Sequence, residues 1–239
     1  QTGRSKRFIL KVSDEPRSLA DWMSLARPWH AGGVRVMTCH SGNDATLEAA
    51  TGTMDPWCPN YQHDVLRPFF RERRQAGDAV WWYCCGVPPT RLTGRPEDNL
   101  PFYWLTAKWR FDGAMSYAAH SLSPHSVETS PVPFRYEHGL SHRLLFLPDG
   151  SLLDTWRREL ESDGIRDNML IEWIRTNLDA RRGTPALRSQ VLAMEQRLEA
   201  LLENVVPYKY GYADTPQVWQ EARAELYDMA AQLAGAGGR

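Results

Sequence analysis

Several features that mark common protein classes are scarce or missing in this sequence of 239 residues. Lys and Arg total 28 against 29 Asp and Glu, and the net charge of −1 gives no electrostatic reason to expect nucleic acid or an anionic membrane as a partner. No apolar run approaches the roughly 20 residues of a membrane helix, and the N-terminal QTGRSKRF lacks the apolar core of a signal peptide. Because the sequence starts with Gln1, we expect a processed or truncated chain, and its cellular location stays open.

Cysteine is also sparse, with four residues that show neither CxxC spacing nor the density of a disulfide scaffold. We therefore expect reduced structural thiols at Cys39, Cys58, Cys84 and Cys85. No spacing of side chains indicates a catalytic metal, and none indicates a cofactor.

What the sequence does contain is enough apolar material for a core and an unusual number of aromatic residues. Hydrophobic residues make up 42%, which favours one large domain or a domain with an appendage. There are ten Trp, nine Tyr and seven Phe, many of them beside predicted strand ends. Such rings suit the flat faces of sugars, although a large core uses them as well.

Short apolar runs rich in β-branched or aromatic residues recur along the first half of the chain, separated by helical or loop segments such as Leu19–Ala26 and Val65–Gln75. Continuous apolar runs are typical of parallel strands buried on both faces, so the pattern predicts a βα-repeat protein. The predicted strands are Phe8–Ser13, Val34–Cys39, Thr53–Trp57, Ala79–Cys85 and Ala114–Ala118.

The second half changes character. Residues 121–137 predict a long surface loop, Arg143–Leu147 a short strand, and the following segment a helix from Asp154 or Thr155 to about Ala180. Two heptad-like patterns then predict a helical hairpin, interpreted as a stabilising appendage over residues 183–239 after a domain of residues 1–182. Their apolar positions are Leu187, Val191, Met194, Leu198, Leu201 and Val205, then Trp219, Ala222, Leu226, Met229 and Leu233.

Asp14 and Glu15 are the strongest candidates for chemistry. They follow the first predicted strand directly, where a parallel strand of a barrel delivers side chains to the catalytic face. Two carboxyl groups so close cannot both ionise freely, which leaves one able to act as a general acid. The alternative is a solvated Asp-Glu-Pro turn that caps the next helix.

An ordered series of motifs adds a resemblance. A strand ending in Asp14-Glu15-Pro16 is followed by MDPWCP from Met54, VWWYCC from Val80, DGAMSY from Asp112, LPDG from Leu147 and TWRRE from Thr155. Between Phe8 and Trp173 this series resembles the catalytic domain of glycoside hydrolase family 123 and its uncharacterised relatives, a domain of unknown function numbered 4091.

The resemblance implies a fold and an activity. The fold would be the C-terminal portion, strands 4 to 8, of a (β/α)8 TIM-type barrel, followed by the helical hairpin. The preceding strands would come from an N-terminal barrel segment or a partner chain missing from this sequence, so the isolated chain is expected to associate and to be inactive by itself. The implied activity is retaining hydrolysis of a terminal β-linked N-acetylhexosamine, with N-acetylgalactosamine favoured. In it the substrate's acetamido oxygen attacks the anomeric carbon, Asp14 orients that group, and Glu15 is the acid/base.

Five further residues are weaker candidates for contacts with a carbohydrate substrate: Asp55, Trp57, Tyr83, Tyr117 and His40. Asp55 could bind a sugar hydroxyl beside the Trp57 ring, or could form a turn before Pro56. Tyr83 and Tyr117 lie at strand ends, and His40 is either a substrate contact or a structural histidine.

Two other functions remain open on the sequence. One is a non-catalytic carbohydrate-binding or assembly protein with a degenerate or incomplete barrel. The other is a conventional two-carboxylate glycosidase whose second carboxylate lies elsewhere in the chain.

Overall fold

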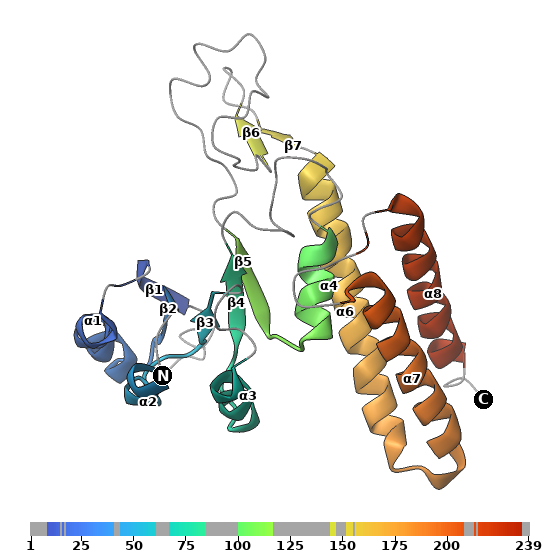
Figure 1. Ribbon diagram of the computed structural model, residues 1–239, viewed down its shortest axis with the longest axis horizontal. Helices are drawn as coiled ribbons and strands as arrows, with labels where there is room; N and C mark the ends of the chain where they lie inside the picture. The colour runs from blue at the N-terminus through green and yellow to red at the C-terminus, as the bar shows by residue number, and fades with distance from the viewer. Residues whose placement is uncertain are drawn as a thin grey trace. The chain divides into compact units, whose positions relative to one another are not determined.

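The computed structural model of the chain describes residues 9–14, 16, 18–40, 44–60, 67–84, 100–116, 144–146, 152–154, 156–207, 213 and 215–235. The chain divides into two compact units (Figure 1). The first comprises Gln1–Cys85 with Phe111–Ser116, and the second comprises Gly86–Arg110 with Tyr117–Arg239.

The first unit alternates parallel strands with helices. Its elements are β1 (Ile9–Asp14), α1 (Leu19–Ala31), β2 (Arg35–His40), α2 (Asp44–Ala49), β3 (Cys58–Pro59), α3 (Pro68–Gln75), β4 (Trp81–Cys84) and β5 (Gly113–Ser116). β1, β2 and β3 form one parallel sheet in that order, and β4 pairs in parallel with β5. Parallel bridges from Trp57 to Val80 and from Asn60 to Tyr83 link the two sheets. The strands therefore neighbour one another in chain order, as the βα-repeat pattern predicts.

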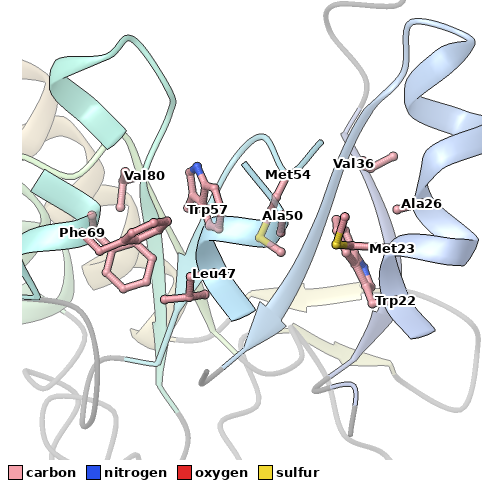
Figure 2. Close-up of a cluster of buried hydrophobic side chains, with 11 residues drawn as sticks. Trp22, Met23, Ala26, Val36, Leu47, Ala50, Met54, Trp57, Phe69 and Val80 are labelled. Carbon is pink, nitrogen blue, oxygen red and sulfur yellow. The ribbon is translucent and has the colours of Figure 1, made fainter. Parts of the chain in front are cut away.

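The main core lies between the strands and the helices. Figure 2 shows Trp22, Met23 and Ala26 of α1 beside Val36 of β2, and Trp57 beside Phe69 of α3. These side chains are almost completely buried. Because α1 presents Trp22, Met23 and Ala26 on one face, it packs along the sheet, and Ser18 caps it by accepting a hydrogen bond from the Asp21 amide at 3.3 Å.

A smaller cluster gathers the strand side chains that alternate with those of the main core. Buried Met37, Cys39, Cys58 and Tyr83 form it, with Ile9, Trp81 and Met115 packed against them. Alternation along β2 places Val36 in one cluster and Met37 in the other, as expected for a strand buried on both faces. Gly113 is the first residue of β5. A larger residue would clash there, because its Cβ atom would lie 2.7 Å from the Trp81 ring.

The second unit is mainly helical. Its elements are α4 (Leu100–Lys108), the antiparallel strands β6 (Leu144–Phe146) and β7 (Leu152–Asp154), α6 (Trp156–Arg182), the 3-10 helix η3 (Pro185–Leu187), α7 (Arg188–Val205) and α8 (Pro216–Gly235). The helical hairpin is confirmed: α7 buries Val191, Leu198, Leu201, Leu202 and Val205, and α8 buries Trp219, Ala222, Leu226, Met229 and Leu233. Among the described helices none is long and apolar enough to cross a membrane.

The hairpin does not stand apart from the preceding helices. Both α7 and α8 pack on α6, and α7 also packs on α4. The compact units thus divide the chain differently from the predicted boundary between residues 182 and 183, because α4 and α6 share one core with the hairpin.

Buried polar contacts join the helices of this unit. Asp167 of α6 is 1% exposed and accepts hydrogen bonds from the Trp104 indole of α4 at 3.0 Å and from Arg223 Nε of α8 at 3.1 Å. Burial raises the pKa of Asp167, while Trp104 and Arg223 act to lower it. Arg175 Nη1 donates to the Ala107 carbonyl of α4 at 2.6 Å.

Candidate functional site

The carboxyl ends of the parallel strands form the candidate site. Asp14 is the last residue of β1, and its backbone pairs with Cys39, which in turn pairs with Cys58. The side chains of Cys39 and Cys58 belong to the smaller cluster, together with Tyr83. The register therefore places the end of β1 beside the strand positions whose side chains face away from the helices.

A β-bulge sets this register. Lys11 pairs with Met37 but Ser13 pairs with Thr38, so Val12 is the extra residue. The buried Thr38 hydroxyl donates to the Ser13 carbonyl at 2.9 Å and fixes the strand just before Asp14. Without the bulge Asp14 would pair one residue further along β2, so this irregularity decides which cluster Asp14 adjoins.

Tyr83 and Asn60 occupy the same edge. A parallel bridge joins them, and the backbone N–H of Asn60 donates to the backbone carbonyl of His40 at 3.2 Å. Tyr83 is 5% exposed, whereas Asn60 is half-buried. Asn60 was not among the residues predicted for the site; the one signal for it in the sequence is a polar residue directly after the apolar WCP segment.

His40 lies at the end of β2 in an aromatic environment. Its ring centroid is 6.1 Å from that of Trp57 and 5.9 Å from that of Phe70, so it faces the helix side of the sheet. The side chain is 3% exposed, and neither ring nitrogen has a hydrogen-bond partner within the described part of the chain. Burial, with a smaller contribution from Arg67, lowers the pKa of His40 to about 4.

This depressed pKa predicts a loss of stability in acid. The folded state holds a neutral imidazole, while the unfolded chain takes up a proton below the ordinary pKa of about 6.5. The free energy of unfolding should therefore fall as the pH drops from 6.5 to about 4, by about 3 kcal/mol in total, and level off below that. Urea denaturation at pH 7 and pH 4 should show that His40→Leu loses this part of the pH dependence. An identical pH dependence in the variant would refute the assignment.

Asp55 and Trp57 are engaged elsewhere. Asp55 forms a bidentate ion pair with Arg35, the first residue of β2, at 2.9 and 3.1 Å. It thus lies near the amino end of β2, not at the edge where β1 ends. The Trp57 indole is fully buried and donates to Asp78 at 2.8 Å.

Of the remaining candidates, Glu15 and Tyr117 lie outside the described residues, as does the side chain of Asp14. The structure thus brings the end of β1 and Tyr83 to one edge of the strands, and it adds Asn60. Among the described residues no three His, Cys, Asp or Glu side chains gather where they could hold a metal ion.

No model of a known protein family matches this sequence, and no curated protein sequence matches it either.

Proposed function

We propose that this chain belongs to a glycoside hydrolase that removes terminal β-linked N-acetylhexosamine, with N-acetylgalactosamine favoured, and that Asp14 and Glu15 are its catalytic pair. The observation that carries the proposal is the position of Asp14 as the last residue of a parallel strand whose neighbours follow in chain order. The carboxyl ends of such strands hold the catalytic residues of (β/α)8 barrels.

The proposed reaction retains the anomeric configuration. The 2-acetamido oxygen attacks the anomeric carbon, the glycosidic C–O bond breaks, and Glu15 donates a proton to the leaving oxygen. The negative charge of Asp14 orients the acetamido N–H and stabilises the positive charge that develops on the oxazolinium ring. Glu15 then removes a proton from the water that attacks the anomeric carbon and opens the ring. Such substrate assistance replaces the enzymatic nucleophile of ordinary retaining glycosidases.

The proposed fold is the last five strands of a (β/α)8 barrel. β1 ends the described order β1-β2-β3, and an uncovered edge strand offers its backbone groups to another strand. We propose that an N-terminal barrel segment or a partner chain pairs there. We also propose that Tyr83 and Asn60, at the edge where β1 ends, contact the sugar.

A thiazoline mimic of the bicyclic intermediate tests the proposal. The wild-type chain together with its N-terminal barrel segment should bind it at least roughly 10²-fold more tightly than it binds N-acetylgalactosamine, because the mimic reproduces the charge distribution of the intermediate. Asp14→Asn should lose most of this preference, since an amide cannot offset the positive charge. Asp21→Asn, an exposed aspartate of α1, is the matched control and should bind as the wild type does. Equal affinity of the wild type and Asp14→Asn would count against the proposed role of Asp14.

A further inference from the structure

A cavity of about 320 Å³ lies in the second unit, where α6 ends, α7 begins and α8 ends. It is partly open to solvent, and most of its wall is apolar. The apolar wall comes from Leu178 of α6, Leu187 of η3, Val191 and Met194 of α7 and Leu233 of α8. A volume above 300 Å³ with a mainly apolar wall is typical of sites for small organic ligands.

Among the described residues of the wall, the charged groups are both cations. Arg181 and Arg197 line the cavity, and no Asp or Glu of the described ranges does. Arg197 is engaged in ion pairs with Glu225 and Asp228 of α8. Arg181 differs, because it forms no ion pair with any residue that the structure describes, and its Nη2 donates only to the Leu233 carbonyl at 2.7 Å.

A guanidinium next to an apolar cavity favours a ligand that has both a carboxylate and a hydrocarbon tail. Its remaining N–H groups can donate to a carboxylate in a fork geometry, and such charge-assisted hydrogen bonds are stronger than neutral ones. Burial of a hydrocarbon tail against the apolar wall is also favourable, because it removes apolar surface from water. A cationic head group would instead be repelled by the Arg181 guanidinium, which has no ion pair within the described residues.

We propose that this cavity binds a small amphipathic carboxylate, such as a medium-chain fatty acid, with its tail against Leu178, Val191 and Leu233 and its carboxylate at Arg181. The site lies wholly within the second unit and is independent of the chemistry proposed for Asp14 and Glu15.

Isothermal titration of the full chain with decanoate, decanol and decylammonium, each below its micelle concentration, tests the proposal. Decanoate should bind saturably and at least roughly tenfold more tightly than decanol, and decylammonium should bind more weakly than both. Arg181→Gln should reduce the affinity for decanoate to that for decanol and leave decanol unchanged. Arg188→Gln, an exposed arginine of α7 outside the cavity wall, is the matched control and should change neither affinity.

A second variant keeps the test decisive if Arg181→Gln fails to fold. Ala193 is exposed on the rim of the cavity, so Ala193→Trp can fill the space without disturbing the buried packing, and it should abolish binding of decanoate and decanol alike. Absence of saturable decanoate binding, equal affinity for decanoate and decanol, or decanoate binding that survives Ala193→Trp would each overturn the proposal.

Discussion

Replacing Glu15 by glutamine should lower kcat/KM by roughly 10²- to 10⁴-fold for N-acetylhexosaminides with poor leaving groups, the range typical of a lost general acid. Substrates with good leaving groups should lose far less in the bond-breaking step, because their oxygen departs with little protonation. Asp14→Asn should instead slow substrates of every leaving-group quality, since its charge acts on the acetamido group.

The measurement is a plot of log kcat/KM against the pKa of the leaving phenol for the wild type and both variants. Glu15→Gln should give a steeper negative slope than the wild type, and Asp14→Asn a similar slope at lower rates. Glu72→Gln removes an exposed glutamate of α3 in the same unit and should leave slope and rate unchanged. If the slope for Glu15→Gln equals that of the wild type, Glu15 is not the general acid.

Replacing Arg223 by methionine should destabilise the helical unit by about 3 kcal/mol, because it leaves the buried Asp167 carboxylate without its charged partner. This value is at the low end of the destabilisation usual for a broken buried ion pair, because the Arg223 side chain is itself 27% exposed. The Trp104 indole still donates to Asp167, but one neutral hydrogen bond does not offset the lost cation.

The stability that Arg223→Met loses should be smaller at low pH than at neutral pH. Burial already raises the pKa of Asp167, and removal of Arg223, which lowers it, should raise it further. A carboxyl group whose folded-state pKa lies above its unfolded value of 3.8 contributes stability that is present at low pH and lost as the pH rises through the folded-state pKa. Arg223→Met should therefore be less destabilised at pH 4.5 than at pH 7.

Urea denaturation of matched variants checks both the destabilisation by Arg223→Met and its dependence on pH. Arg223 pairs with Asp163 as well, and Arg166 pairs with the same carboxylate but is 63% exposed. Arg166→Met should therefore cost less than about 0.5 kcal/mol. The double variant Asp167→Leu with Arg223→Met should recover much of the loss, because no unpaired charge remains buried. Equal effects of Arg166→Met and Arg223→Met would contradict the buried ion pair.

The sequence predicted the strands of the first unit well where the apolar runs are uninterrupted. β1, β2, β4 and β5 lie within one or two residues of their predicted bounds. The third strand was predicted at Thr53–Trp57, but β3 is Cys58–Pro59, with isolated bridges at Met54 and Trp57. Pro56 interrupts the run because it has no backbone N–H to donate.

Other elements escaped prediction for physical reasons. The segment of α4, LPFYWLTAK, is apolar on most of its faces and buried from Pro101 to Ala107 except at the half-buried Tyr103, so it shows no amphipathic period. The segment Leu19–Ala26 was predicted only as a helical or loop segment, whereas α1 spans Leu19–Ala31 and includes Pro28, whose missing N–H falls in the exposed last turns of the helix.

The site was less predictable than the strands, since it depends on register and on side-chain partners. The position of Asp14 at a strand end follows from the apolar run before it, but the bulge that pairs it with Cys39 leaves no mark in the sequence. The ion pair of Asp55 with Arg35 joins residues 20 positions apart, and the Trp57 contact with Asp78 spans 21 positions. Such partners are set by tertiary packing, which no local pattern reports.

Hydrolysis of two matched aryl β-glycosides by the chain together with its N-terminal barrel segment tests the central claim most directly. One substrate carries a 2-acetamido group, and the other has a hydroxyl group in its place. Substrate assistance predicts that the acetamido substrate is cleaved at least about 10³-fold faster, because an intramolecular nucleophile is lost with the acetamido group. Equal rates for the two substrates, or no hydrolysis of either by the chain together with its N-terminal barrel segment, would contradict the account.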